Sequence, residues 1–350
     1  MRSIAFASVF AVLVAACGGA AAPSAAPSKS AAPSVAAATS AASPTPGPAA
    51  KVKFNWTAVS GASSGLWTAY EAGYFKDENL DVTLEHIPSS SRAVAALLAG
   101  DIQFTHLDGE VDIDADLKGA DIRMVYGITN RLVFSVMTQP SITSPDQLKG
   151  KRLGITRAGS STDTAARLAL DMWHLKPTDV TFVPLTEVPA IFTGLSAKQI
   201  DAGVVSPPTN YRAKVAGFHE LLNLATDGPQ WPSVGIGTTE KYLKANPDVV
   251  KRVIMAYSKG VWRFKTDKAF ALTVLQKYLK VSDQAVLTNT WEQFSKYLAE
   301  PPYVLGMDNT LKEVAKTNPS VSKLKTSDLI DDSIVKQLDD SGFYKQLYGK

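Results

Sequence analysis

Residues 96–104, with the sequence ALLAGDIQF, have a loose counterpart in GLSAKQIDA at residues 194–202. Each copy has the pattern of a helix end, a tight turn and a short buried strand. A single unit of this kind cannot bury its own apolar face, so each copy must belong to a larger layer of helices on a sheet. The repeat therefore predicts two αβ lobes, with one copy in each.

Short β-rich runs alternate with helical runs on both sides of the repeat. One helical run is residues 161–175, where Ala165, Leu168, Met172 and Leu175 share a face. This alternation predicts an α/β fold with parallel or mixed sheets covered by helices, and a region that is almost wholly helical follows Lys241. The predicted strands are residues 52–57, 80–86, 102–105, 122–126, 133–138, 152–155, 180–185 and 201–205.

The chain opens with an apolar run from Ile4 to Ala16, preceded by a single charge at Arg2. The run is too short to cross a bilayer and ends in small residues, so it predicts a secretory signal peptide over residues 1–16. Its end resembles a bacterial lipobox. That resemblance implies that Cys17 carries lipid and holds the protein at the outer face of the cell membrane. An ordinary signal peptide followed by a chance cysteine is the alternative.

Residues 17–51 consist almost entirely of Ala, Pro and Ser after Cys17. Such a segment cannot bury enough apolar surface to offset its ordering entropy, so it predicts a disordered linker. The remaining roughly 300 residues exceed what one hydrophobic core usually organises, which again favours two lobes. No later apolar run is long enough to span a membrane.

The composition excludes several classes of function. Cys17 is the only cysteine, so disulfides, cysteine nucleophiles and cysteine-rich metal sites are excluded. A net charge of +3 with no basic stripe argues against nucleic-acid binding. The four histidines lack the spacing of metal ligands, and the acidic run that begins at Asp108 fails the EF-hand pattern. We therefore predict neither a metal nor a cofactor.

Residues 73–82, GYFKDENLDV, resemble the GFFKKEGLDV segment of the solute-binding proteins of sulfonate, nitrate and taurine ABC transporters, a family that includes binders of thiamine-pyrimidine precursors. The resemblance implies a type II periplasmic-binding-protein fold, in which two αβ lobes close on a ligand. It implies a lobe 1 of residues 52–138 plus 232–350 and a lobe 2 of residues 139–231, with crossovers near Gln139-Pro140 and Gly228 to Pro232. Further matches, in family order, are residues 95–104, 146–154, 175–180 and 199–202.

The resemblance also implies a function. It describes an extracytoplasmic lipoprotein, monomeric and without enzymatic activity, that captures a small polar organic ligand and delivers it to a permease and its ATPase. The ligand can be sulfonate-like, zwitterionic or a pyrimidine-like nitrogen compound. A sensor lobe that reports to a membrane receptor is an alternative. Eukaryotic members that synthesise the thiamine pyrimidine need a cysteine-rich motif, which this sequence lacks.

Four polar turns follow predicted strands, at residues 60–64, 89–92, 160–163 and 206–211. Ligands of open αβ sheets bind at the carboxyl ends of strands, where helix N-termini offer free N–H groups. Two turns from each lobe would then face one another across a cleft. Simple N-capping by Ser and Thr is the alternative. The candidate ligand-binding residues are Ser63, Ser64, Ser90, Ser91, Asp108, Ser160, Ser161, Thr162, Ser206 and Trp231.

Asp108 belongs to an acidic run, residues 106–116, with five acids and no Lys or Arg. The sulfonate-binding relatives tend to carry small, neutral residues here. A carboxylate at Asp108 or Glu110 would repel a sulfonate and attract an amine or a protonated ring. In the alternative interpretation Asp108 caps a helix, Glu110 stabilises its positive end, and the later acids face solvent.

Aromatic residues are candidates for a stacking wall. Trp231 lies near the second crossover, in a hinge-like stretch, whereas Trp67 and Tyr70 fit core positions on a helix. His174 stands at a helix end where relatives often have Gly, and it predicts a left-handed cap.

An esterase is the competing enzymatic hypothesis, because residues 61–65, GASSG, match the G-x-S-x-G nucleophile elbow around Ser63. Hydrolases place this elbow after several strands, whereas here it follows the first. No Asp and His partners stand out downstream, so this is the lesser alternative.

Overall fold

The structure is a computed structural model that describes residues 47–349. The predicted signal peptide, the lipidation site Cys17 and most of the predicted linker lie outside the described residues. The last two residues of that linker, Ala50 and Lys51, belong to strand β1 (Ala50–Trp56).

The first sheet has five strands in the order β2-β1-β3-β10-β4. Strands β1, β2 and β3 are parallel, and β10 is antiparallel to both of its neighbours. In β1, exposed Lys51 and Lys53 alternate with buried Val52 and Phe54, which is the period expected of a strand with one face on a core. The other strands are β2 (Leu80–His86), β3 (Phe104–Leu107), β4 (Ile122–Thr129) and β10 (Val234–Thr239).

The second sheet has the order β7-β6-β8-β5-β9. Here β6, β7 and β8 are parallel, and β5 is antiparallel to its two neighbours. The fourth strand is therefore the antiparallel one in both sheets. The strands are β5 (Ser135–Thr138), β6 (Arg152–Ile155), β7 (Thr181–Pro184), β8 (Ala202–Val205) and β9 (His219–Asn223).

The internal repeat maps onto equivalent places in the two sheets. Strands β3 and β8, which end the two copies, are each third in their sheet. The preceding helices end in left-handed residues, Gly100 with φ 81° and Lys198 with φ 56°, which make the tight turn. The predicted α/β fold with two mixed sheets, one copy of the repeat in each, is confirmed.

The chain passes from the first sheet to the second at residues 130–134 and returns at residues 228–233. Strand β5 pairs with β8 and β9 in the second sheet, although the predicted lobe 1 extended to Thr138. The first crossing therefore precedes β5 instead of following it at Gln139-Pro140. The sequence of a strand indicates that it is buried but does not indicate which sheet it joins. The hydrogen-bonded neighbours of the strand determine the sheet to which it belongs.

All eight predicted strands are present, but the sequence reading missed β9 and β10. Strand β9 is short and mostly half-buried, so it lacks a continuous apolar run. Strand β10 contains Gly235 and Gly237, which weaken the β pattern. These glycines allow close packing, since a Cβ on Gly237 would lie 2.7 Å from Leu107 Cδ2.

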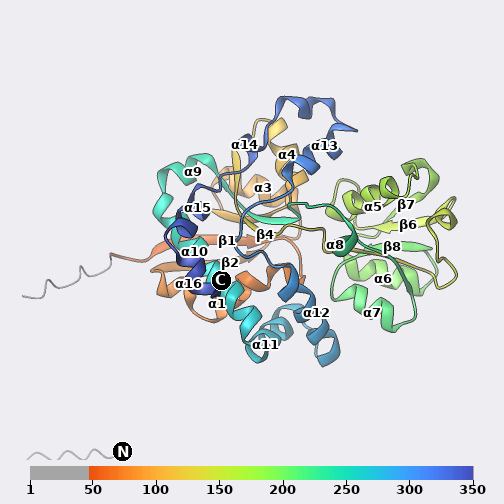
Figure 1. The fold of residues 1–350 in the computed structure, drawn as a ribbon, viewed down its shortest axis with the longest axis horizontal. Helices are drawn as coiled ribbons and strands as arrows, with labels where there is room; N and C mark the ends of the chain where they lie inside the picture. Colours follow the sequence, from red (N-terminus) through yellow and green to blue (C-terminus); the bar gives the residue numbers. More distant parts are fainter. Residues whose placement is uncertain (1–46, 350) are drawn as a thin grey trace, which may run out of the picture. The chain divides into compact units, whose positions relative to one another are not determined.

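Helices flank both sheets, and the green lobe at the right of Figure 1 holds the second sheet with α5, α6 and α7. After Thr239 the chain is helical almost throughout, as predicted. The helices that begin before β10 are α1 (Ser64–Glu71), α2 (Tyr74–Asp77), α3 (Ser90–Ala99), α4 (Gly109–Leu117), α5 (Ser161–Met172), α6 (Val188–Ser196), α7 (Thr209–Val215) and α8 (Leu224–Asp227). Those after β10 are α9 (Glu240–Ala245), α10 (Pro247–Thr266), α11 (Lys268–Leu279), α12 (Gln284–Tyr297), α13 (Met307–Ala315), α14 (Thr326–Leu329), α15 (Ser333–Asp340) and α16 (Phe343–Tyr348). Four 3₁₀ turns are η1 (Gly61–Ser63), η2 (Pro145–Leu148), η3 (Pro177–Asp179) and η4 (Pro319–Lys323).

Separate apolar cores support the two sheets. Phe54, Trp67 and Phe264 lie in the core under the first sheet, and Leu170 and Val204 lie in the core under the second. His174 has φ 58°, so the predicted left-handed cap is confirmed.

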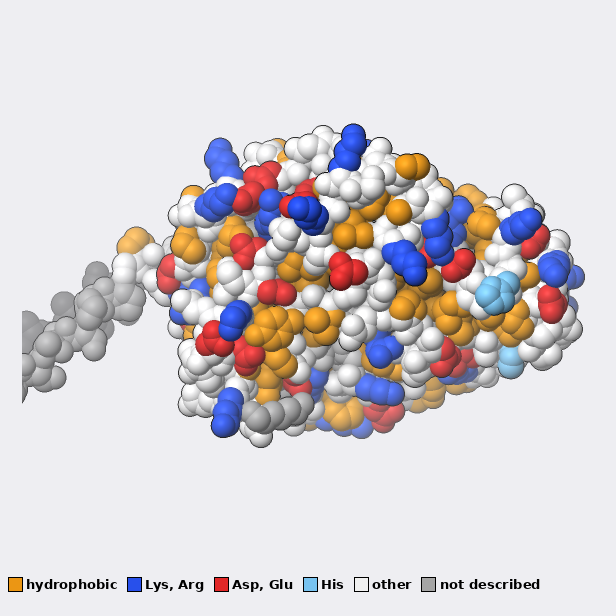
Figure 2. Space-filling model, turned by 45° about the horizontal axis from the view of Figure 1, so that its top comes forward, with side chains coloured by type: hydrophobic (Ala, Val, Ile, Leu, Met, Phe, Trp, Pro, Cys, Tyr) orange, Lys and Arg blue, Asp and Glu red, His pale blue; other side chains and the backbone are white. Residues whose placement is uncertain are grey.

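Within residues 47–349, no helix combines the length and the apolar character that a membrane span requires. Figure 2 shows acidic and basic side chains interspersed on the visible face, without a patch of one sign.

Candidate ligand-binding site

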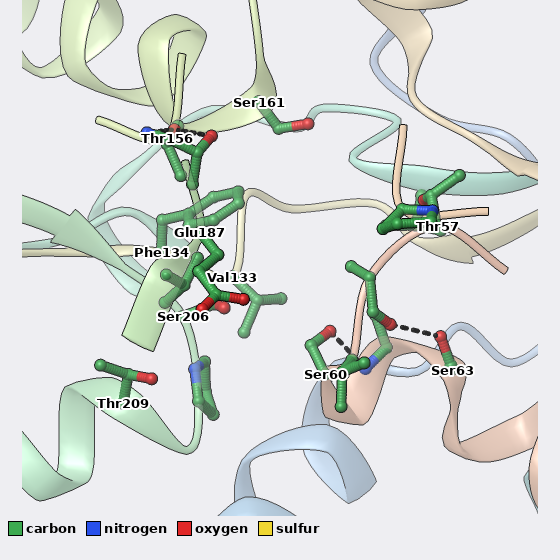
Figure 3. Close-up of a pocket in the computed structure, with 18 of the residues that line it drawn as sticks. Thr57, Ser60, Ser63, Val133, Phe134, Thr156, Ser161, Glu187, Ser206 and Thr209 are labelled. Carbon is green, nitrogen blue, oxygen red and sulfur yellow. Dashed lines mark hydrogen bonds between the residues drawn. The ribbon is translucent and has the colours of Figure 1, made fainter. Parts of the chain in front are cut away.

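A cavity of about 560 Å³ lies between the two sheets. Its walls are the turns that follow β1, β2 and β3 on one side and β6, β7 and β8 on the other. Helices α1, α3, α5 and α7 begin near these turns, so free N–H groups and hydroxyls converge on the space. In Figure 3, side chains from the first lobe, such as Thr57 and Ser60, lie opposite Thr156, Ser206 and Thr209 of the second.

On the wall of the first lobe, Ser63 belongs to a chain of buried hydrogen bonds. Its Oγ lies 3.3 Å from His106 Nδ1, and His106 Nε2 lies 3.2 Å from the hydroxyl of Tyr257. Burial lowers the pKa of His106 to about 3, so the ring is neutral. The hydroxyl oxygen of Tyr257 also accepts a hydrogen bond from the backbone N–H of Leu66, so the hydroxyl proton of Tyr257 is free to be donated to His106 Nε2. This network assigns the ring proton to Nδ1, which donates to Ser63, and Ser63 donates to the carbonyl of Ala58 at 3.2 Å.

On the wall of the second lobe, hydroxyls bond to one another before α5. Thr156 Oγ1 lies 2.8 Å from both Ser160 Oγ and Thr162 Oγ1. Thr162 Oγ1 also accepts the backbone N–H of Thr156 at 2.8 Å. These bonds fix the turn, so the hydroxyls of Ser160 and Thr162 are already engaged. The neighbouring Ser161 points across the cavity instead (Figure 3).

Asp108 links the two lobes. It is the N-cap residue of α4, but its side chain makes no capping bond. Its Oδ2 instead accepts hydrogen bonds from Ser161 Oγ of α5 at 2.9 Å and from Ser90 Oγ of α3 at 3.4 Å. Burial raises the pKa of Asp108 to about 6, although these two hydroxyls and Arg157 act in the opposite direction. The alternative interpretation of Asp108 as a helix cap is therefore wrong for its side chain.

Glu110, in the first turn of α4, is buried beside Asp108. Its Oε2 accepts the indole N–H of Trp231 at 3.3 Å, and its Oε1 has no partner among the described residues. Burial, together with the charge of Asp108, raises the pKa of Glu110 to about 7. Two carboxyl groups in one helical turn thus lie out of water at the junction of the lobes.

The later acids of the run do not all face solvent, contrary to the alternative interpretation. Asp114 is exposed and pairs with Lys118. Asp112 is fully buried, both of its carboxyl oxygens lack a partner among the described residues, and burial raises its pKa well above the ordinary value. Burial also raises the pKa of Asp116, to about 6. In a helix, residues four positions apart share a face, so Asp108, Asp112 and Asp116 lie on the same side of α4. The acids alternate with other residues in the sequence, and this pattern does not reveal the shared face.

Seven of the ten candidate residues line the cavity: Ser63, Ser90, Asp108, Ser160, Ser161, Thr162 and Ser206. The other three do not. Ser64 is buried within α1, and the Ser91 hydroxyl lies 3.2 Å from that of Ser89 on the surface of α3. Trp231 is 1% exposed in the core of the second lobe, so it is not a stacking wall. Contact between the seven lining residues and a ligand stays a prediction.

The sequence reading missed several lining residues. Arg157 and Glu187 lie in the turns that follow β6 and β7, so the rule that selected the polar turns also fits them. Arg212 lies one turn into α7. Phe294 and Leu279 come from α12 and α11, whose sequences show only helix and give no sign that they reach the cavity.

The geometry does not support Ser63 as a nucleophile. The structure does place a histidine beside it, which the sequence reading had not found. However, His106 donates to Ser63 in the network above, and the partner of the ring is a neutral tyrosine hydroxyl rather than a carboxylate. With a pKa near 3, the ring is too weak a base to activate a hydroxyl at neutral pH.

The amino-acid sequence of the chain matches the model of a known protein family. The model described as "NMT1/THI5 like" matches residues 61–267, which is more than half of the chain. The chain belongs to the NMT1/THI5-like family. The matched residues include the whole second sheet, the strands of the first sheet other than β1, and the turns that follow β2, β3, β6, β7 and β8. No curated protein matches the chain in sequence.

Solved structures confirm the fold. The periplasmic aliphatic sulphonate-binding protein SsuA of Escherichia coli superimposes with a TM-score of 0.66 at 16% identity, over 86% of this chain and 99% of that one. The periplasmic nitrate-binding protein NrtA of Synechocystis gives 0.67 at 11% identity, over 84% and 89%. A Candida albicans gene product with the generic periplasmic-binding-protein fold gives 0.61 at 19% identity, over 83% and 94%. This member of the NMT1/THI5-like family therefore has the periplasmic-binding-protein fold, as predicted.

Proposed function

We propose that the chain is an extracytoplasmic solute-binding protein of an ABC importer, which encloses a small polar organic molecule between its lobes. The observation that carries the proposal is the cavity, whose walls come from both sheets and meet at the ends of parallel strands. Its volume of about 560 Å³ falls within the usual range for small-molecule sites. The solved neighbours that bind sulphonate and nitrate support the same class of function.

The proposed mechanism is a population shift. A ligand that contacts both walls makes its full set of contacts only when the lobes are closed, so binding favours the closed form, and a permease recognises that form. We keep the predicted division into two lobes as part of this proposal, with β5 moved to lobe 2. The crossings at residues 130–134 and 228–233 then act as the hinge.

The charges on the walls favour a zwitterionic ligand among the three predicted classes. Arg157 and Arg212 supply positive charge on the second lobe, and Glu187 lies near them. Asp108 is the acidic residue on the wall of the first lobe. A bare sulfonate would bring a further negative charge towards Asp108, whereas a molecule with both an anionic and a cationic end would complement both walls.

Attachment and delivery complete the proposal. Lipidation at Cys17, with residues 18–49 as a tether, would hold the two lobes close to a membrane permease. Signalling to a membrane receptor is the alternative use of the same closure. A permease gene and an ATPase gene found beside the gene of this chain would decide for transport.

A thermal-shift experiment tests the ligand class. Ethanesulfonate, taurine and 4-aminopyrimidine represent the three classes, and taurine differs from ethanesulfonate chiefly by its ammonium group. A ligand at about 100 times its Kd should stabilise the protein by about 2.7 kcal/mol. We expect taurine to be the most effective of the three, and Asp108→Asn to remove its advantage over ethanesulfonate. Stabilisation by sugars or peptides and by none of these three compounds would contradict the proposed class.

A further inference from the structure

The first turn of α4 contacts both the second lobe and the returning crossover. The N–H of Gly109 donates to the carbonyl of Pro232 at 3.0 Å. A Cβ at Gly109 would lie only 2.6 Å from Pro232 Cγ, so the backbone is pressed against the crossover. The residues on either side of Gly109 are the two buried acids, Asp108 and Glu110.

Each of these acids has a partner beyond its own lobe. Asp108 accepts Ser161 Oγ from α5 of the second lobe. Glu110 accepts the indole N–H of Trp231, whose ring packs in the core of the second lobe. The carboxyl groups therefore join the lobes where the lobes meet, and a hinge motion that separated α4 from α5 would break the bond to Ser161.

Few charges act on the pair. Arg157, in the turn before α5, acts on Asp108, and Asp108 acts on Glu110. The hydrogen-bond donors to the pair are neutral: Ser90 from α3, Ser161 and Thr164 from α5, and Trp231 from the crossover. Asp163 on α5 pairs with Arg167.

Two ionised carboxylates in this position repel each other, and burial disfavours the charge of Glu110 more than the hydrogen bonds from Trp231 and Thr164 compensate it. A proton on the pair removes the repulsion and leaves the hydrogen bonds from Ser161 and Trp231 in place. Opening of the lobes also weakens the repulsion between the two carboxylates, because water then reaches and screens them. Closure and proton uptake are therefore linked.

We propose that Asp108 and Glu110 form a proton-dependent latch, in which a proton held by the pair favours the closed lobes and its loss favours the open lobes. The physiological meaning of the latch rests on the proposed function: in acidic surroundings the lobes of the binding protein would spend more of their time closed. The chemistry of the two carboxyl groups themselves does not depend on the identity of the ligand.

The expected size follows from linkage. In the closed form burial holds the pKa of Glu110 near 7, whereas a hydrated glutamate in open lobes has its ordinary value of 4.5. The closed form binds the proton more tightly, so the ratio of closed to open protein rises as pH falls. Between pH 8.0 and pH 5.5 the change from Glu110 alone is about 27-fold, and Asp108 acts in the same direction.

Distance measurement between spin labels tests the latch without any ligand. Leu98 on α3 and Val215 on α7 are exposed, one on each lobe, so Leu98→Cys and Val215→Cys in a full chain with Cys17→Ser give two label sites. We expect the closed population to grow by about 27-fold relative to the open one from pH 8.0 to pH 5.5. A ratio that does not change with pH would overturn the proposal.

Matched variants separate the latch from other titrating groups. Asp108→Asn combined with Glu110→Gln keeps the shape and the acceptors but cannot titrate, so its distances should no longer depend on pH. Asp114→Asn removes an exposed acid of the same helix and should behave as the unaltered chain does. Ser161→Ala should shift the population toward open at pH 5.5. A pH response that persists in the double variant, or a Ser161→Ala chain that closes normally, would refute the latch.

The result is independent of the ligand search. A chain that closes with acid but binds none of the tested compounds would support the latch and contradict the proposed ligand class. A chain that binds taurine but shows the same distances at both pH values would support the proposed function and refute the latch.

Discussion

Glu110→Gln is expected to stabilise the protein at high pH and to change its stability little at low pH. In the native chain, Glu110 is 9% exposed and one of its carboxyl oxygens has no partner among the described residues. The glutamine keeps an oxygen that accepts the N–H of Trp231 and carries no charge at any pH. The substitution therefore isolates the cost of ionising a buried carboxyl group.

The magnitude comes from the change in pKa. Folding raises the pKa of Glu110 from 4.5 to about 7, through burial and the charge of Asp108. Each pKa unit corresponds to about 1.4 kcal/mol, so the ionised form costs about 3 kcal/mol of unfolding free energy. Because the folded pKa is the higher one, the stability is complete below pH 4.5 and is lost as the pH rises through 7. Lobes that open rehydrate the group, so about 3 kcal/mol is an upper limit.

Urea unfolding at pH 4 and pH 8, followed by circular dichroism, gives the free energies of unfolding. The difference between Glu110→Gln and the unaltered chain should increase by up to about 3 kcal/mol from pH 4 to pH 8. Glu292→Gln on α12 is the matched control, because Glu292 is exposed. Equal differences at the two pH values for Glu110→Gln would show that the carboxyl group is hydrated in the folded protein and would refute the reasoning.

Two further predictions concern Asp112, one turn further along α4, and the N-terminus. Asp112→Asn should raise the melting temperature relative to the unaltered chain more at pH 8 than at pH 4, because burial raises the pKa of Asp112 and its oxygens have no partner among the described residues. A shift of equal size at both pH values in calorimetry would contradict this. Cys17→Ser should abolish incorporation of a labelled fatty acid and release the protein from the membrane fraction. Continued membrane attachment of the variant would refute lipidation at Cys17.

The local sequence predicted most of the secondary structure because local rules govern it. The two repeat copies lead into β3 and β8, which hold equivalent places in their sheets, and strands β2 and β6 have the predicted bounds. The strands that were missed or misplaced depend on distant partners. Strand β10 inserts between β3 and β4, far away in sequence, and its glycines follow from that contact rather than from strand propensity.

The polar turns after strands located the cavity, because the carboxyl ends of parallel strands share one edge of a sheet. Individual contacts were less accessible. Trp231 was expected in the cleft but fills the core of the second lobe, since a turn residue carries no sign of the direction in which its side chain points. Phe294 and Leu279 reach the cavity only because the C-terminal helices fold back over it.

The sequence by itself determined the α/β class, the two-lobe organisation, the family and the position of the polar turns, because periodicity, turn chemistry and motif order are properties of neighbouring residues. The tertiary structure decided what the acidic run does. Asp108 contacts Ser161, 53 positions away, and Glu110 contacts Trp231, 121 positions away. Whether a carboxyl group is a solvated cap or a buried link between lobes depends on which distant surface removes its water, and only the packed fold specifies that surface.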